Sequence, residues 1–325
     1  MPVELLDDPT AFRARDWTGL VASDPSGTFF HTPAYLKLWW EEFGDGRLVV
    51  ALVHDEGRPV AACCLQVEDG LLTFLGGFDV TDYMGPVGLP GVEDRAAKEL
   101  LATLADEVEW ARADLRGIPI ESPWFGALEA AAAAQGLSVE RGEDGVCPVL
   151  PLPASYDAYL AGLPAKLRHE IRRKERRLRA EFGDYVVEFC GPDRLPEFYD
   201  RFLELHRQSP GPKGKFMHAG MEIFFRRLGE ALIADHIFHL GFIEVEGVRA
   251  AGFIGFAYKD TFLLYNSAFD RGFAHFSPGM VLIAHMIERA IGERRHTFDL
   301  LKGDLDYKYR FGARPRPIGR LVIDR

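Results

Sequence analysis

The segment 299–312 concentrates ionisable and aromatic side chains near the end of the chain. It follows a short apolar run that we predict to be a strand, and open α/β sheets bind ligands beyond the carboxyl ends of their strands. In this setting Tyr307 can donate a proton to a leaving group, Lys308 can stabilise an oxyanion or a phosphate, and Asp304 can accept a proton or orient an amine. The alternative is a surface loop whose aromatic side chains pack into the core.

A second candidate is the start of a predicted helix at Ser277-Pro278-Gly279-Met280. Serine is a favourable N-cap, and proline sets the φ angle of the first turn. The backbone N–H groups of Gly279, Met280 and Val281 are then expected to be free to bind an anion at the positive end of the helix dipole. We assign Ser277, Gly279, Met280 and Val281 to cofactor binding, although any well-capped helix has the same pattern.

The segment 166–179 contains eight Lys and Arg residues, and its apolar positions recur about every four residues, as in a helix. Arg168, Arg172 and Arg176 fall on one stripe, where like charges four residues apart repel each other. Two explanations remain open: a solvated face, docked on the acidic first half of the chain, or a site for phosphate groups. We assign the three arginines to substrate binding.

Two further polar segments are candidates. Tyr265 and Asn266 lie at the end of a predicted strand, and Asp82 and Tyr83 lie in the loop that corresponds to it in the first half. We assign Tyr265 to catalysis, Asn266 to cofactor binding, and Asp82 and Tyr83 to substrate binding. Turn formation explains both segments equally well.

Composition and missing motifs exclude several classes of protein. The chain has 325 residues, of which 47% are hydrophobic and 27% charged, so a folded globular protein is expected. We find no apolar run long enough for a membrane span, an acidic N-terminus unlike a secretion signal, and four cysteines without a C-x-x-C motif. We therefore expect a cytoplasmic protein without a metal site. The hydrolase elbow, the Walker loop and the dinucleotide fingerprint are also missing.

A weak internal repeat indicates how these residues are positioned. Three short apolar runs separated by tight turns occur at 47–75 and again at 236–268, and Glu56-Gly57 and Glu246-Gly247 are 190 residues apart. The order strand, helix, helix, three strands, helix, strand, helix, strand appears twice. This order predicts an α/β fold with two mixed sheets. The alternative is that any α/β chain can be divided so that it looks repeated.

The charge distribution places the domain boundary near residue 150. Residues 1–150 carry 10 Lys and Arg against 26 Asp and Glu, a net charge of −16, whereas residues 151–325 carry 28 against 23, a net charge of +5. We predict domains at 1–150 and 151–325, with a helical hairpin at 155–182 and a final strand at 317–323 that packs back on the first domain. The other predicted elements include helices at 9–20 and 94–113 and a strand at 118–121.

The segments 167–174, 265–267, 277–279 and 298–312 together resemble the FemAB-like and CelD-like branch of the GNAT acyltransferase superfamily, best over residues 160–325. The resemblance implies two tandem GNAT folds with the active cleft in or beside the second. It also implies direct attack of an amine or hydroxyl on a thioester, with the pyrophosphate of acetyl-CoA or another acyl-CoA bound at Ser277–Met280. Lys308 matches the lysine-bearing segment of Fem-like peptidyl transferases. One departure is that the segment 271–276 has a single glycine where the usual pyrophosphate loop has two.

Three hypotheses follow. The first is an acyl-CoA-dependent N- or O-acyltransferase acting on a small molecule, glycan or peptide of the cell envelope or of polysaccharide synthesis. The second is an aminoacyl-tRNA-dependent Fem-like transferase, favoured by the arginine stripe and the missing glycine. The third is a non-catalytic binding module that uses a groove between the acidic and basic halves.

Overall fold

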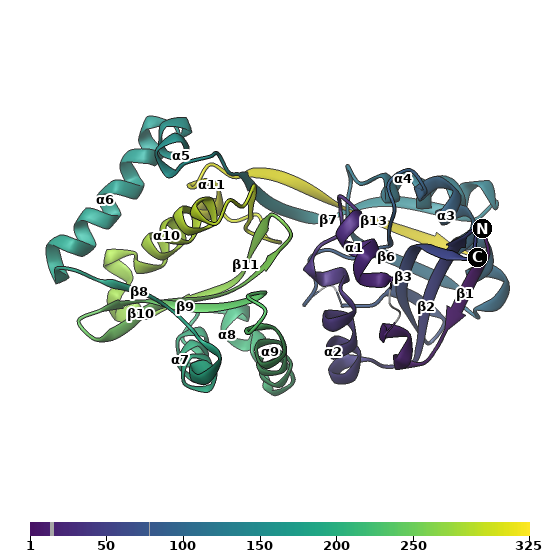
Figure 1. Cartoon of the computed structure of the whole chain (residues 1–325), viewed down its shortest axis with the longest axis horizontal. Coiled ribbons are helices and arrows are strands. Elements are labelled where there is room, and N and C mark those ends of the chain that lie inside the picture. Colours follow the sequence, from purple (N-terminus) through teal and green to yellow (C-terminus); the bar gives the residue numbers. More distant parts are fainter. Residues whose placement is uncertain (14–15, 78) are drawn as a thin grey trace. The chain divides into compact units, whose positions relative to one another are not determined.

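The computed structural model describes residues 1–13, 16–77 and 79–325 (Figure 1). The chain divides into two compact units. Unit 1 comprises Met1–Cys147 and Arg316–Arg325, and unit 2 comprises Pro148–Pro315. Each unit contains a mixed sheet covered by helices. None of the helices among the described residues is long and apolar enough to span a membrane.

The sheet of unit 1 has the strand order β1-β2-β3-β4-β6-β13-β7, and β5 pairs with β3. Strands β2, β3 and β4 form an antiparallel meander, β4 pairs with β6 in parallel, and β13 pairs with β6 antiparallel. The strands are β1 (Val3–Leu6), β2 (Arg47–Asp55), β3 (Arg58–Glu68), β4 (Leu71–Phe74), β5 (Val87–Gly88), β6 (Arg112–Pro119), β7 (Ser138–Pro151) and β13 (Arg314–Asp324). Alternate residues of β2, namely Val49, Ala51 and Val53, belong to a buried apolar core together with Val60, Ala61, Cys63 and Leu65 of β3.

Two long helices of unit 1 pack on each other and on this sheet. The helical elements are η1 (Pro9–Arg13), α1 (Trp17–Ser23), η2 (Phe29–His31), α2 (Pro33–Phe43), α3 (Glu93–Glu107) and α4 (Pro123–Ala134). Helix α3 places Ala97, Leu100 and Leu104 in the core, four or three residues apart, as an amphipathic helix requires. Helix α4 adds Trp124 and Phe125 to the same core.

The sheet of unit 2 has the order β12-β11-β10-β9-β8, and the end of β7 pairs with β12. Its strands are β8 (Val186–Phe189), β9 (Phe238–Val245), β10 (Val248–Tyr258), β11 (Thr261–Phe269) and β12 (Thr297–Asp299). Strands β8 to β11 are antiparallel, and β11 pairs with β12 in parallel.

Helices cover both faces of this sheet. The helical elements are α5 (Tyr156–Gly162), α6 (Ala165–Phe182), η3 (Pro192–Arg194), α7 (Leu195–Arg207), α8 (Pro212–Phe216), α9 (Ala219–Leu232), η4 (Arg271–Phe276), α10 (Pro278–Gly292) and α11 (Asp306–Tyr309). Helix α10 packs on β10 and β11, and the hairpin of α5 and α6 packs on α10. Helices α7, α8 and α9 lie on the opposite face (Figure 1).

The predicted repeat is confirmed at the level of strand pairing. The order β1-β2-β3-β4-β6-β13 in unit 1 corresponds to β8-β9-β10-β11-β12-β7 in unit 2, with the one parallel pair at the same place. The matching turns also have the same backbone: the φ angles are 48° and 78° at Glu56-Gly57, and 49° and 78° at Glu246-Gly247. Two positive φ angles in succession are typical of the tight hairpin turns that match the twist of antiparallel strands.

Three predicted elements are wrong in their limits. Helix α3 ends at Glu107 instead of continuing to residue 113, because Val108 is extended and the indole N–H of Trp110 donates to the carbonyl oxygen of Leu104. The following strand β6 therefore begins at Arg112, six residues before the predicted start. The predicted helix 9–20 is instead η1 followed by α1, and residues 14 and 15 of that prediction lie outside the described residues.

Candidate functional site

A pocket of ≈ 740 Å³ lies within unit 2, a size typical of small-molecule sites. Helix α6, the short helix α8, the end of β11, the start of α10 and the segment 304–310 form its walls. The lining residues are Lys174, Lys213, Ser267, Phe269, Ala274, Ser277, Pro278, Gly279, Met280, Ile283, Asp304, Leu305, Asp306, Tyr307 and Arg310. The pocket thus brings together Ser277, Gly279, Met280, Asp304 and Tyr307 of the predicted site.

The start of α10 differs from the predicted capped helix with three free amides. The N–H groups of Met280 and Val281 donate to the carbonyl oxygen of Ser277, at 3.0 and 3.3 Å, so these two amides are already engaged. Ser277 is left-handed, with φ 55°, and its side chain makes no capping bond. Its hydroxyl instead accepts a hydrogen bond of 3.0 Å from the ammonium of Lys174. Val281 itself is buried in the core.

Lys213 and Tyr307 meet at Ser267, at the end of β11. The ammonium of Lys213 donates to the carbonyl oxygen of Ser267 at 2.6 Å, and the hydroxyls of Tyr307 and Ser267 are hydrogen-bonded. Lys213 is exposed to solvent at the pocket, although protein atoms lie close around its side chain. Partial desolvation by these atoms, together with the charge of Lys308, lowers the pKa of Lys213 to about 8. Burial raises the pKa of Tyr307, so its hydroxyl stays protonated.

Lys308 is not among the residues that line the pocket and is only 3% exposed. Its ammonium donates to the carbonyl oxygens of Leu301 and Lys302, at 2.7 and 2.8 Å. These bonds hold the loop after β12, where Leu301 has a φ of 57°, an uncommon angle for a side chain branched at Cγ. The direct role of Lys308 in catalysis stays a prediction. Its observed contacts are those of a residue that positions the loop.

Asp304 lines the pocket and accepts a hydrogen bond of 2.5 Å from the hydroxyl of Tyr309. Lys174 and Arg310, which the sequence analysis did not select, approach a shared carboxylate on Glu170, at 3.7 and 3.2 Å. Burial lowers the pKa of Lys174, and the nearby charge of Glu170 opposes this shift. Lysine and arginine side chains from three separate segments therefore face one pocket.

Tyr265 and Asn266 do not line this pocket. The pairing of β10 with β11 shifts by one residue between Ile254 and Gly255, which leaves Tyr265 as an extra residue in β11. Such a bulge re-aims side chains, so that two consecutive residues can face the same side of a sheet. Tyr265 accordingly packs against Phe225 of α9, and the amide of Asn266 donates to Nε2 of His206 in α7 at 3.1 Å. Their predicted roles stay predictions.

The remaining predicted substrate residues lie apart from the pocket lining. Arg168 donates to the carbonyl oxygens of Leu160 and Ala161 at the end of α5, at 3.3 Å each. Arg172 and Arg176 are exposed on α6. In unit 1, Asp82 is half-buried and Tyr83 is 1% exposed.

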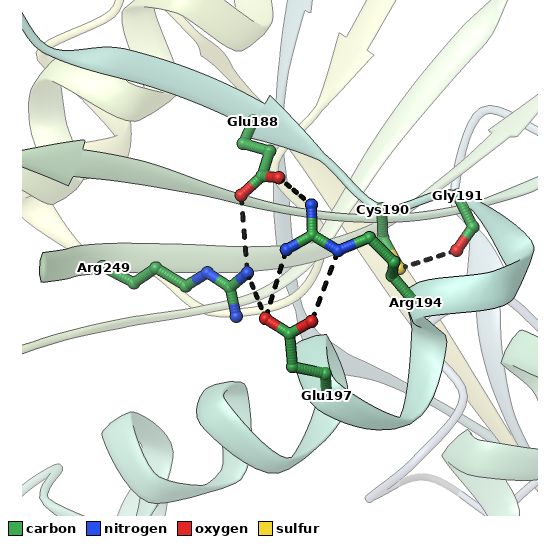
Figure 2. Close-up of polar contacts among 6 residues, drawn as sticks. All are labelled: Glu188, Cys190, Gly191, Arg194, Glu197 and Arg249. Atoms are coloured by element: carbon green, nitrogen blue, oxygen red, sulfur yellow. Dashed lines mark hydrogen bonds and ion pairs between the residues drawn. The ribbon is translucent and has the colours of Figure 1, made fainter. Parts of the chain in front are cut away.

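A second pocket in unit 2, of ≈ 650 Å³, is lined mostly by charged residues that pair with one another. Figure 2 shows Arg249 of β10 and Arg194 of η3 between the carboxylates of Glu188 and Glu197. Arg249 lies 2.6 Å from Glu197 and 3.4 Å from Glu188, and Arg194 contacts both. This network joins β8, α7 and β10, and its charges are used within the fold.

Among residues 1–13, 16–77 and 79–325, no group of three or more His, Cys, Asp or Glu side chains is arranged so that it could hold a metal ion.

Lys213 is the most informative pocket residue that the sequence did not reveal. It lies between Gly211-Pro212 and Gly214, in a short link between two long helices. The glycine and proline residues that flank Lys213 were the available signal, because such a link is typical of loops that carry function.

Comparisons with known proteins agree with this architecture. Residues 165–309 match the family model described as acetyltransferase (GNAT) domain. FemX is similar in structure, with a TM-score of 0.70 and 11% identity over 98% of this chain and 97% of that one. A conserved protein of unknown function from Bacteroides thetaiotaomicron has a TM-score of 0.68 and 17% identity, with full coverage of both chains. The C-terminal domain of a putative lysylphosphatidylglycerol synthetase from Agrobacterium fabrum has a TM-score of 0.61 and 12% identity over 98% and 93%.

No curated protein matches the sequence. At these identities the structural matches show the fold alone. The chain has a tandem GNAT-like fold, and residues 165–309 of its second unit are similar to the GNAT acetyltransferase domain.

Proposed function

We propose that unit 2 transfers an acyl group from a thioester donor to an amine or hydroxyl acceptor in the pocket beside α10. The observation that carries this proposal is the meeting of Lys213 and Tyr307 at Ser267. A lysine with a pKa of about 8 and a protonated tyrosine on one pocket wall form a base and an acid at neutral pH. The GNAT family match over 165–309 supports the same reaction class.

In this reaction the acceptor nitrogen or oxygen forms a bond to the acyl carbon, and the carbon–sulfur bond of the thioester breaks. The neutral form of Lys213 accepts the proton from the attacking group. Burial keeps Tyr307 protonated before the reaction, so that its hydroxyl can donate a proton to the leaving thiolate. The proton that Lys213 took from the acceptor then restores the phenol of Tyr307. Lys308 acts through Lys213, because its charge helps to lower the pKa of Lys213.

The start of α10 fits the phosphates of an acyl-CoA donor. A Cβ atom at Gly279 would meet nothing within 4 Å, so the space beside this residue is open. Lys174, bonded to the hydroxyl of Ser277, supplies positive charge where the amides of Met280 and Val281 are engaged. Replacing Gly279 with Trp fills this space and is expected to weaken acyl-CoA binding.

The test is an assay of thiol release from a panel of acyl-CoA donors with amine, sugar and peptide acceptors. Tyr307→Phe and Lys213→Met are each expected to lower kcat by about 100-fold, the range of general acid–base catalysis. Lys215→Met is the matched control, because Lys215 is exposed on the same helix α8 and does not line the pocket. Its kcat is expected to stay within about twofold. Full activity of both pocket variants would refute the proposed roles.

A second candidate is a Fem-like transferase that takes its donor group from aminoacyl-tRNA. It is favoured by the similarity to FemX and to a lysylphosphatidylglycerol synthetase domain, and by the exposed Arg172 and Arg176 on α6. Affinity for tRNA is then expected to fall steeply with salt, and Arg172→Gln with Arg176→Gln to reduce that slope by about two. Undetectable tRNA binding, or binding independent of salt, would exclude this donor.

The CelD-like acceptors stay a prediction, as does the non-catalytic binding module. The binding module predicts that Tyr307→Phe and Lys213→Met leave the cellular role intact. Loss of that role in a folded Tyr307→Phe protein would exclude it.

A further inference from the structure

The pocket in unit 2 has one cationic and one apolar wall. Lys174, Lys213 and Arg310 face it from α6, α8 and the segment after α11 and form the cationic wall. Asp304 and Asp306 also line the pocket, so its three cationic side chains exceed its carboxylates by one. The apolar wall consists of six residues from β11, η4, α10 and the loop before α11, namely Phe269, Ala274, Pro278, Met280, Ile283 and Leu305. The cationic side chains can orient an anionic ligand, but an anionic group alone gives no reason for six apolar residues in the lining.

Two residues of the apolar wall are unusually exposed. Phe269 is 45% exposed and Leu305 is 52% exposed, whereas Phe253 and Phe298 of the same unit are fully buried. Phe269 ends β11 and Leu305 precedes α11, so two separate segments present large apolar side chains to one pocket. A ligand that covers them gains the free energy of removing apolar surface from water.

The apolar wall continues from these exposed residues to the core. Ile283 is 3% exposed and belongs to the main core cluster of unit 2, and Met280 packs against that cluster. The apolar lining comes from β11, α10 and the loop before α11, and an acetyl group offers it only one methyl group. A longer hydrocarbon chain can contact all three.

We infer that the pocket selects donors with a medium or long acyl chain joined to an anionic group. The chain lies against Phe269, Leu305, Met280 and Ile283, and the anionic group lies beside the cationic wall. This inference rests on the proposed function, because it names the acyl group that the reaction transfers. The apolar wall thus determines chain length, and the residues at Ser267 carry out the chemistry.

Calorimetry with the whole protein tests the inference. Octanoyl-CoA is expected to bind at least about tenfold more tightly than acetyl-CoA, since each fully buried methylene contributes up to about fourfold. In the double variant Phe269→Ser, Leu305→Ser this ratio is expected to fall below about threefold. Ile223→Ser is the matched control, because Ile223 is 49% exposed on α9 and does not line the pocket. If circular dichroism shows that the double variant is unfolded, Leu305→Gln replaces it.

The outcomes separate the inference from the proposed function. Equal Kd values for acetyl-CoA and octanoyl-CoA in the natural protein would overturn the chain selectivity and leave acyl transfer standing. If no coenzyme A ester binds, that donor fails, and octyl phosphate compared with inorganic phosphate decides the inference. Tighter binding of octyl phosphate that the double variant loses supports the chain site, and equal binding of the two overturns it.

Discussion

The carboxylate of Asp114 in unit 1 is expected to stabilise the pairing of β6 with β13. Asp114 is 8% exposed and accepts four hydrogen bonds from two arginines. Arg116 donates from Nε and Nη2 at 2.9 and 2.7 Å, and Arg320 donates from Nε and Nη2 at 2.6 and 2.9 Å. Asp114→Asn keeps the size of the side chain and removes its charge.

The expected loss follows from burial. Removing one partner of a fully buried ion pair costs about 3–5 kcal/mol, whereas an exposed pair contributes about 1 kcal/mol or less. The arginine side chains here are 25% and 34% exposed, so solvent screens part of the interaction. The amide oxygen of Asn can still accept a hydrogen bond. We therefore expect Asp114→Asn to lower the free energy of unfolding by about 2 kcal/mol.

The assay uses a property of the sequence: all five tryptophans lie in unit 1, at positions 17, 39, 40, 110 and 124. Tryptophan fluorescence during urea unfolding at pH 7 therefore reports on this unit. Asp324→Asn is the control, because Asp324 pairs with Arg112 across the same two strands at 3.3 Å but both side chains are about half exposed. Its effect is expected to be below about 0.5 kcal/mol.

The pH dependence of the free energy of unfolding tests whether the negative charge of Asp114 is responsible for this stabilisation. Burial alone raises the pKa of Asp114, but the hydrogen bonds from Arg320 and Arg116 outweigh it and hold the pKa below the usual 3.8. A carboxylate with a lowered folded-state pKa stabilises the protein above its unfolded pKa, and this contribution is lost as the pH falls through the folded value. The difference between natural protein and variant should therefore be constant from pH 7 to about 5 and shrink below pH 4. Equal effects of Asp114→Asn and Asp324→Asn at pH 7 would refute the reasoning.

Two further predictions concern unit 2, and circular dichroism during urea unfolding measures both. Arg249→Met is expected to lower the free energy of unfolding by about 1–2 kcal/mol, because Arg249 is 12% exposed, pairs with two carboxylates and lies 4.1 Å above the ring of Phe198. Arg194→Met, at a side chain 49% exposed, should cost less than about 0.5 kcal/mol, and the reverse order would contradict this account. Burial and the charge of Lys213 lower the pKa of His206 to about 4, so stability should fall as the pH drops from 6.5 to 4, by at most about 3 kcal/mol from this residue. His206→Phe should flatten that slope, and an unchanged slope would show that His206 does not titrate there.

Local signals in the sequence were sufficient for the order of the strands within the two meanders. Turn pairs such as Glu56-Gly57 and Glu246-Gly247 mark hairpins, and hairpins fix which strands are neighbours. The boundary between α3 and β6 was not predicted correctly, because apolar residues such as Val108 and Trp110 are compatible with both a helix and a strand. Only their packing in the folded unit decides between the two. Element order therefore follows from local chemistry, whereas element limits depend on contacts with distant residues.

The site was predictable only in part, for physical reasons. Ser277 and Tyr307 are close in sequence to elements that end at the pocket, and topology brings these ends together. Lys213 reaches the pocket from a five-residue helix on another segment, so no spacing rule connects it with Tyr307. The bulge at Tyr265 also has no local signal, yet it decides which face of the sheet Tyr265 and Asn266 occupy. Burial of Lys308 is likewise a tertiary property.

Strand β13 has a consequence for biosynthesis. It pairs with β6 in unit 1, although the whole of unit 2 separates the two strands along the polypeptide. During translation, residues 148–315 emerge from the ribosome before β13, the second partner of β6, is complete. The edge of β6 thus remains open throughout that interval, and a nascent chain must keep it from pairing with other molecules until the final strand arrives.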